Sequence, residues 1–179
     1  FIMNPISCLD LKQQHQKIKS EIFEAFEKVY ENTAFSGGVF VEGFEKKFAE
    51  FCGVKYAVAV NNGTSALHLA MLALGIGRGD EVIIPANTFI ATAWGVSYTG
   101  ATPVFVDCDA DTWEIDPGKI EEKITEKTKA IIGVHLYGQP FDFDKVADIA
   151  KKHNLHLVED AAQAQGAKYK NKKTGSLAD

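Results

Sequence analysis

The stretch HLVEDAAQ, residues 156–163, decides how the rest of the chain is interpreted. Leu157 and Val158 belong to a short apolar run that predicts a strand buried on both faces. Glu159 and Asp160 follow where such a strand would leave the sheet, and ligands collect beyond the carboxyl ends of strands in an open parallel sheet. Taken alone, Asp160 has a simpler interpretation as the cap of a following helix, where Asp is common.

Similar apolar runs recur along the chain, and helix-like segments separate most of them. The runs predicted as strands are residues 56–60, 81–85, 102–106, 130–134 and 155–158. The segments predicted as helices are residues 64–74, 88–98, 117–125 and 142–153. The strands are continuous and β-branched, which is typical of a parallel sheet covered on both faces. The sequence therefore predicts an α/β fold with a mostly parallel sheet and helices on both faces.

Two amphipathic helices are predicted before the first strand, at residues 10–31 and 41–52, with a small polar loop at 32–38 between them. Apolar residues stand at helical spacing in both segments. They are Ile18, Ile22, Phe26 and Val29 in the first and Phe44, Phe48 and Phe51 in the second. These faces are expected to lie in the core or at a contact between subunits.

Composition limits the classes of function. The 179 residues suffice for one domain with a substantial core, and the net charge of -5 argues against nucleic acid as a partner. No apolar run is long enough to cross a bilayer, and residues 1–12 show no signal-peptide pattern. The cysteines Cys8, Cys52 and Cys108 lack metal-ligand spacing, which favours reduced thiols and a cytoplasmic protein without a membrane partner.

The turn after the first predicted strand is a candidate phosphate site. Gly63 lets the backbone approach a ligand, and Thr64 and Ser65 bring hydroxyls to the first turn of a helix, where free amides and the helix dipole favour an anion. A simple Ser/Thr cap of the helix is the alternative interpretation.

The turn after the second strand carries an aromatic residue. Thr88 is expected to cap the next helix, which places Phe89 on its first turn near the carboxyl edge of the sheet. There Phe89 is a candidate to stack on a flat ring, with a core position facing the sheet as the alternative.

Two further turns have less specific patterns. Asp107, Asp109 and Asp111 follow the third strand, but they lack the spacing of a calcium loop, and no metal site is predicted. His135 follows the fourth strand and is either a base or substrate contact, or a histidine hydrogen-bonded to backbone. The run from Lys168 to Lys173 is expected to be a solvated turn.

Carboxyl ends of parallel strands open on one edge of the sheet, so these turns would meet there. A planar aromatic cation that carries a phosphate would satisfy the phosphate site, the aromatic residue and the carboxylate together. Pyridoxal 5'-phosphate (PLP) is such a molecule. Its phosphate would contact Gly63, Thr64 and Ser65, its ring would lie against Phe89, and its pyridinium nitrogen would meet Asp160.

The same motifs resemble those of the DegT/DnrJ/StrS-type nucleotide-sugar aminotransferases, PLP enzymes of fold-type I. The motifs occur in the family's order and are NGTSAL at 62–67, PANTF at 85–89, HLYG at 135–138 and EDAAQ at 159–163. The resemblance implies that Phe89 stacks on the cofactor ring, that Asp160 pairs with the ring nitrogen and that Gln163 lies near the ring hydroxyl. A carboxylate beside the pyridine nitrogen stabilises its protonated form, which makes the ring a better electron sink.

The resemblance also implies what the chain lacks. The family's Schiff-base lysine is expected beyond Asp179, and the lysines between 168 and 173 do not match its position. Residues 1–179 are therefore expected to be the N-terminal helices plus the PLP-binding portion of the large domain, without the rest of that domain and the C-terminal small domain. Such a fragment alone would be inactive, and the resemblance implies a homodimer.

Three functions remain open at this point. The first is transamination of a nucleotide-linked keto-sugar, with glutamate as the expected amino donor, in amino-sugar or polysaccharide biosynthesis. The second is a PLP-dependent sugar dehydratase, in which histidine replaces the lysine. The third is a non-catalytic binding module of the same fold.

Overall fold

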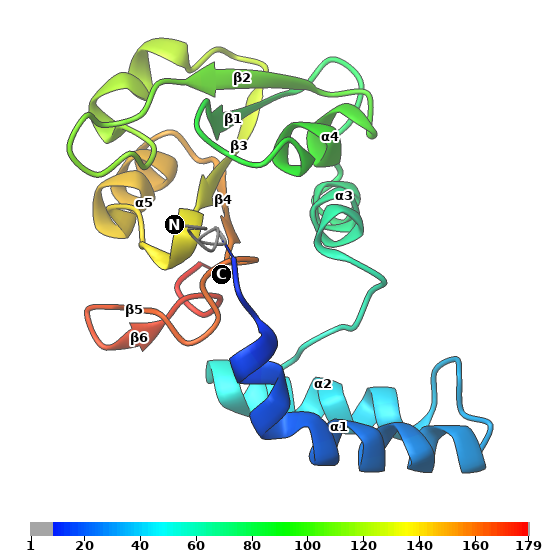
Figure 1. Ribbon diagram of the computed structural model, residues 1–179. Helices are drawn as coiled ribbons and strands as arrows, with labels where there is room; N and C mark the ends of the chain where they lie inside the picture. Colours follow the sequence, from blue (N-terminus) through cyan, green and yellow to red (C-terminus); the bar gives the residue numbers. More distant parts are fainter. Residues whose placement is uncertain (1–8, 179) are drawn as a thin grey trace, which may run out of the picture. The chain divides into compact units, whose positions relative to one another are not determined.

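The computed structural model describes residues 9–178 (Figure 1). The chain divides into two compact units, with the boundary between Lys46 and Lys47, inside the second helix. Cys8 and most of the segment inspected for a signal peptide lie outside the described residues. No described helix combines the length and apolar character needed to cross a membrane.

The N-terminal helices form as predicted. Helix α1 spans Lys12–Glu31 and helix α2 spans Val39–Cys52. No residue of α1 is buried, and Phe26, Phe44 and Phe51 are 61%, 54% and 44% exposed. The core interpretation of these phenylalanines is therefore wrong, because their rings remain largely open to solvent, whereas a contact between subunits stays a prediction.

A four-stranded parallel sheet forms the centre of the second unit, which confirms the predicted α/β class. The strands are β1 (Glu81–Pro85), β2 (Thr102–Val106), β3 (Thr128–Val134) and β4 (His156–Asp160), in the order β2-β1-β3-β4. Every neighbouring pair runs parallel, so all four carboxyl ends meet at one edge (Figure 1).

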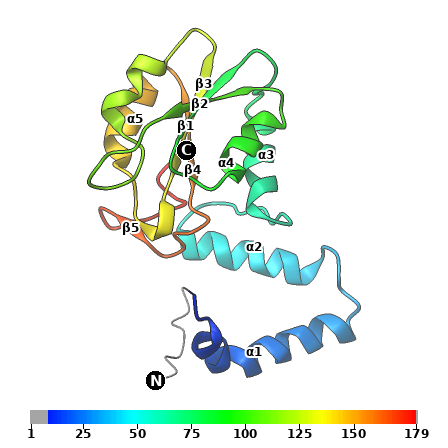
Figure 2. The same cartoon turned by 45° about the horizontal axis from the view of Figure 1, so that its top comes forward.

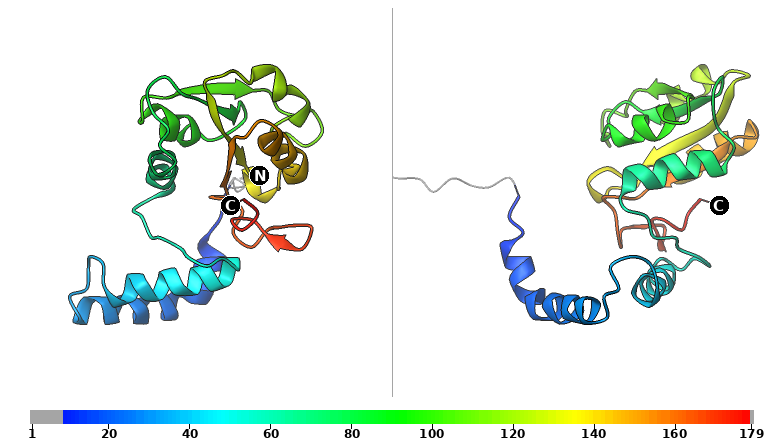
Figure 3. Two further views of the ribbon diagram at one scale, coloured as in Figure 1. Left: turned by 180° about the vertical axis from the view of Figure 1, so that it is seen from behind. Right: turned by 90° about the vertical axis from the view of Figure 1, so that its right-hand side faces the viewer.

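Helices cover both faces of this sheet (Figures 2 and 3). Helices α3 (Gly63–Ala73) and α4 (Ala91–Ser97) lie on one side, and α5 (Phe143–Lys152) lies on the other. Side chains alternate along β1, so Val82 and Ile84 enter the core beside α3 and α4, while Ile83 enters the core beside α5. Each of these fully buried side chains contributes about 1.5–3 kcal/mol of transfer free energy.

Close packing of α4 on α3 brings the turns that precede these two helices together. Gly95 in α4 has no room for a side chain, since a Cβ there would lie 2.7 Å from Leu67 Cβ. Helix α3 starts at the cap Asn62 and ends before Gly75, whose positive φ of 73° suits glycine.

Two predicted elements are wrong. Residues 56–60 are outside both described sheets, and Tyr56 and Val58 are 74% and 81% exposed. A β-branched run forms a strand only where a neighbouring strand can pair with it, and the described strands pair without it. Residues 117–125 form two 3₁₀ turns, Pro117–Lys119 and Glu121–Lys123, instead of an α-helix.

The last segment is more ordered than predicted. The predicted solvated turn is present at Lys170 and Asn171, which are exposed, and the short strands β5 (Lys168–Tyr169) and β6 (Lys172–Lys173) flank it as an antiparallel hairpin. Lys170 and Asn171 make its two-residue turn with φ of 45° and 71°, the left-handed geometry that suits a twisted hairpin. The sequence lacks the Asn-Gly or Asp-Gly pair that usually signals such a turn. The two short strands beside the turn were therefore not predicted.

Candidate functional site

A cavity of about 300 Å³ opens at the carboxyl edge of the sheet. It is lined by residues from the start of α3, from the turns after β1, β3 and β4, and from the neighbouring strand ends. They are Asn62, Gly63, Thr64, Leu67, Phe89, Ala91, Val134, Leu136, Asp160, Ala162 and Gln163. Five of the six predicted cofactor residues are among them, and Ser65 is the exception. The structure therefore brings the predicted phosphate site, aromatic residue and carboxylate to one place.

The turn predicted to bind phosphate is capped by Asn62 rather than by the hydroxyls of Thr64 and Ser65. The Asn62 side chain caps α3, with its Oδ1 accepting a hydrogen bond from the Ser65 backbone N–H at 2.8 Å. The prediction that Thr64 or Ser65 is the cap is wrong, because the carbonyl of Asn62 already reaches that amide. Gly63 and Thr64 are left to face the cavity from the positive end of an 11-residue helix.

Phe89 lies at the cavity with 62% of its surface exposed. The core interpretation of Phe89 is wrong, since a core ring would be buried against the sheet. Thr88 is not the helix cap either, because α4 begins after Ile90 and its cap makes no side-chain hydrogen bond.

Asp160 is the last residue of β4, paired with Val134 in the sheet, so the strand runs two residues further than predicted. Its Oδ1 accepts the backbone N–H of Ala162 at 3.1 Å. Its Oδ2 accepts the hydroxyl of Thr92 at 3.3 Å, and the Thr88 and Thr92 hydroxyl oxygens lie 2.8 Å apart. The helix-cap interpretation of Asp160 is wrong, because turns rather than a helix follow it in residues 161–167.

Sequence reasoning missed Thr92. This threonine is fully buried in α4, and its contact with Asp160 joins residues 68 positions apart. A local signal existed, because Thr88 and Thr92 are four residues apart and such residues are neighbours on a helical turn.

Gln163 joins the cavity to the turn after β3. Its Oε1 accepts the backbone N–H of Tyr137 at 2.8 Å. Tyr137 has a φ of 52° and is 89% exposed. A non-glycine residue in this conformation costs free energy, which the hydrogen bond that Tyr137 donates to Gln163 helps to offset.

His135 is not in the cavity wall. It is fully buried, stacked on Phe141 with ring centroids 4.6 Å apart, and its Nδ1 accepts the Phe141 backbone N–H at 3.4 Å. Its Nε2 lies 3.0 Å from Glu159 Oε2. Because both ring nitrogens of His135 are engaged away from the cavity, the interpretation as a base or substrate contact is wrong. The alternative, a histidine hydrogen-bonded to backbone, is confirmed for Nδ1, whereas Nε2 contacts a carboxylate.

Glu159 collects four hydrogen bonds. Besides His135, the backbone amides of Gly175, Leu177 and Ala178 donate to its carboxylate at 2.9, 2.6 and 2.7 Å. Burial alone would raise the pKa of Glu159, but these four donors outweigh it and hold the pKa below its ordinary value. The carboxylate therefore ties the segment 175–178 to the sheet.

The carboxylates of Asp107 and Asp109, in the acidic loop after β2, are paired with nearby protein groups. Asp107 pairs with Lys119 at 3.1 Å. Asp109 Oδ1 accepts the amides of Asp111 and Thr112 and the Thr112 hydroxyl. Within residues 9–178, no group of three potential ligands is arranged to hold a metal ion.

Glu114 on the same loop is buried, with 4% of its surface exposed. Burial raises its pKa to about 7, against a smaller opposing effect of the Leu136 backbone amide. The folded state therefore binds a proton that the unfolded chain releases near pH 4.5, and stability falls as pH rises from about 4.5 to about 7. We expect Glu114→Gln to raise the free energy of unfolding by about 2–3 kcal/mol at pH 8 and to change it little at pH 4.

Urea unfolding at the two pH values measures this effect. Glu122→Gln is the control, because the Glu122 side chain is 63% exposed and only contacts Lys123 at 3.7 Å. An equal change in Glu114→Gln stability at pH 4 and pH 8 would contradict the buried-carboxyl explanation.

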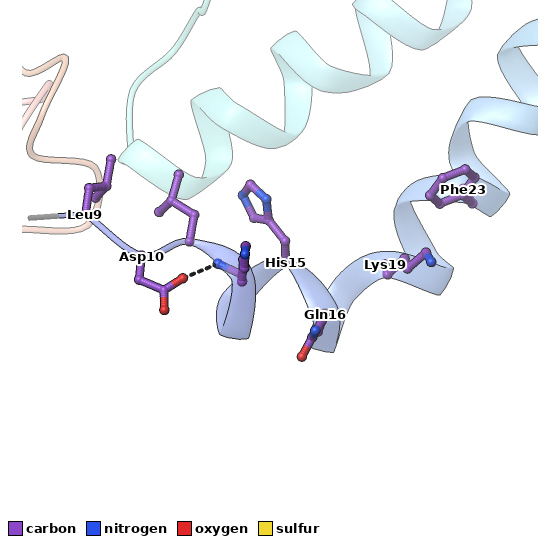
Figure 4. Close-up of a pocket in the computed structure, with 8 residues that line it drawn as sticks. Leu9, Asp10, His15, Gln16, Lys19 and Phe23 are labelled. Carbon is purple, nitrogen blue, oxygen red and sulfur yellow. Dashed lines mark hydrogen bonds between the residues drawn. The ribbon is translucent and has the colours of Figure 1, made fainter. Parts of the chain in front are cut away.

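A second hollow, along the start of α1, does not assemble a site (Figure 4). It is lined by residues of a single segment between Leu9 and Phe23. The Asp10 carboxylate accepts the backbone N–H of Lys12 at 2.9 Å, and the side chains of His15 and Gln16 point in opposite directions. These groups do not converge on a common point.

Comparison with known proteins shows the family of this chain. The model of the DegT/DnrJ/EryC1/StrS aminotransferase family matches residues 16–179. The chain belongs to this family. GDP-perosamine synthase of Caulobacter vibrioides is 58% identical over 144 residues, which cover 80% of this chain and 39% of that protein.

Other family members match over a longer part of the chain. The dTDP-3-amino-3,6-dideoxy-alpha-D-galactopyranose transaminase of Aneurinibacillus thermoaerophilus is 51% identical over 97% of this chain and 48% of its own length. The crystal structure of DesV from S. venezuelae superposes with a TM-score of 0.92 at 45% identity, covering 95% of this chain and 46% of DesV. The DegT-family chain thus spans less than half the length of these relatives, and its fold is that of the aminotransferases.

Proposed function

We propose that this chain supplies the PLP-binding part of a nucleotide-sugar aminotransferase. The observation that carries the proposal is the single cavity that holds both Asp160 and the N-terminal turn of α3. A carboxylate and a helix N-terminus that line one cavity match a molecule with a basic ring nitrogen and a phosphate. The structure of NtdA from Bacillus subtilis, at 36% identity and a TM-score of 0.85, contains the related cofactor PMP.

Each lining residue has a proposed role in binding the cofactor. Gly63 and Thr64 hold the phosphate, with the Ser65 hydroxyl as a further donor, because the Ser65 amide is used by Asn62. Phe89 covers one face of the ring. Asp160 pairs with the ring nitrogen, and the amide group of Gln163 approaches the ring hydroxyl.

PLP supplies an electron sink on which an amino group and two electrons pass from a donor to a keto group. The residues of this chain bind and orient it, and Asp160 keeps the ring nitrogen protonated. The relatives named as nucleotide-sugar aminotransferases support a nucleotide-linked keto-sugar as acceptor, with glutamate as the proposed donor. The proposed setting is cytoplasmic amino-sugar biosynthesis.

The proposal includes a larger assembly. We propose that residues beyond Asp179 complete the large domain, add a small domain and provide the Schiff-base lysine. A homodimer is proposed as well, and the exposed apolar faces of α1 and α2 around Phe26 and Phe44 are candidate contacts. Crosslinking between copies through cysteines introduced beside Phe26 would test that contact.

The test uses the complete polypeptide that contains this chain. Titration with PLP should produce a cofactor absorption band that borohydride converts into a stable covalent attachment. With GDP- and dTDP-linked keto-sugars, glutamate should be consumed and 2-oxoglutarate formed in equal amount to the amino-sugar. Binding of PLP with loss of water from the sugar and no glutamate consumption would support a dehydratase instead. No PLP binding at all would overturn the proposal.

A further inference from the structure

The carboxylate of Asp160 is held by protein groups at both of its oxygens. Oδ1 accepts the Ala162 backbone N–H at 3.1 Å, and Oδ2 accepts the Thr92 hydroxyl at 3.3 Å. Two donors from different elements restrict rotation of the carboxylate, because turning its plane would break both contacts. The carboxylate thus faces the cavity in one orientation before any ligand arrives.

The Thr92 hydroxyl takes part in two hydrogen bonds, one with Asp160 and one with Thr88. A hydroxyl has one proton to give, and once the Thr92 proton points to Asp160, its oxygen is left to accept. The Thr88 hydroxyl is 2.8 Å away and fills that position, so the hydrogen bonds run from Thr88 to Thr92 to Asp160. Such chains strengthen each member, and burial of Thr92 keeps water from replacing it.

We propose that Thr92, supported by Thr88, is a positioning residue that orients the Asp160 carboxylate toward the ring nitrogen of the cofactor. The effect of this orientation on cofactor binding rests on the proposed function, because it requires a bound ring. The orientation itself is a property of the protein without cofactor. Neither threonine is proposed to contact the reacting atoms.

Two substitutions at one position separate the hydroxyl from the shape of the side chain. Thr92→Val keeps the volume and removes the donor, whereas Thr92→Ser keeps the donor. In the complete polypeptide, we expect Thr92→Val to raise the Kd for PLP about tenfold, the size of one lost hydrogen bond to a charged group. Thr92→Ser should stay within about twofold, and Thr88→Val should show an intermediate rise because it acts through Thr92.

Two readouts and a control variant distinguish orientation from a general loss of structure. The ¹⁵N chemical shift of labelled PLP reports protonation of its ring nitrogen, and it should move toward the neutral form in Thr92→Val. Thr99→Val is the matched control, since it removes a hydroxyl that donates to the Val96 carbonyl at 2.8 Å, away from Asp160. In cofactor-free protein, hydrogen exchange of the Ala162 amide should become about tenfold faster in Thr92→Val, because a rotating carboxylate releases it.

The exchange measurement decides the inference even if the function is wrong. Should the polypeptide bind no PLP, the proposed function fails, and Ala162 exchange still shows whether Thr92 holds Asp160. Unchanged Ala162 exchange in Thr92→Val would overturn the positioning role. PLP binding that falls equally in Thr92→Val and Thr92→Ser would overturn it as well, because the serine retains the donor.

Discussion

Asp160→Asn is expected to weaken PLP binding and slow turnover by about 10- to 1000-fold. The asparagine keeps the shape of the side chain and an oxygen for the Ala162 amide, but it removes the negative charge. An opposite charge within hydrogen-bonding reach shifts a pKa by about 1–3 units, and each unit is a factor of ten in the protonated population. PLP titration and steady-state kinetics of the complete polypeptide measure the two effects.

The comparison with an exposed aspartate shows whether the effect is local. Asp111→Asn changes the same charge on the loop after β2, outside the cavity, and should leave PLP affinity unchanged. The ring-nitrogen ¹⁵N shift should move to the neutral form in Asp160→Asn alone. If Asp160→Asn binds PLP as tightly as the original protein with the same ¹⁵N shift, the carboxylate does not pair with the ring.

Part of the cavity was predictable because the turns after β1, β3 and β4 follow from one rule of topology. Apolar runs at 81–85, 102–106 and 130–134 predicted parallel strands. These runs lie within β1, β2 and β3, respectively. Parallel strands place their following turns at one edge of the sheet, so residues far apart in sequence were expected together. Phe89 and Asp160 meet at the cavity for that reason, whereas Gly63 stands at the start of α3, which follows no described strand.

What could not be predicted depends on pairs with no local signal. Residues 56–60 have strand-like composition, yet composition does not provide a neighbouring strand. The contacts of Thr92 with Asp160 and of Glu159 with Leu177 depend on how helices and turns pack after folding. Glu159 and Asp160 are adjacent in sequence, but their side chains lie on opposite faces of the strand, because side chains alternate along it. Glu159 therefore contacts the segment 175–178, and Asp160 contacts Thr92.

Glu159→Gln is expected to lower the free energy of unfolding by about 3 kcal/mol at pH 7. The substitution removes a buried charge whose four donors include the amides of Leu177 and Ala178, and it turns an NH₂ group toward amides that need an acceptor. The loss would extend to His135 and to Phe141, which stacks on it. Because Phe141 also occupies the space above Gly133, where a Cβ would lie 2.2 Å from the ring, it has no nearby position to move to.

The pH dependence identifies the charge as the cause. The pKa of Glu159 is held below its ordinary value of 4.5, so the carboxylate stabilises the fold above that pH, and the contribution disappears as pH falls through the lower folded-state pKa. The difference between the original protein and Glu159→Gln, followed by urea unfolding, should therefore shrink as pH falls below about 4. Glu126→Gln, which alters an exposed carboxylate, should change stability little at either pH. A difference that stays constant down to pH 3 would mean that packing, not the ionised carboxylate, holds residues 175–178 against the sheet.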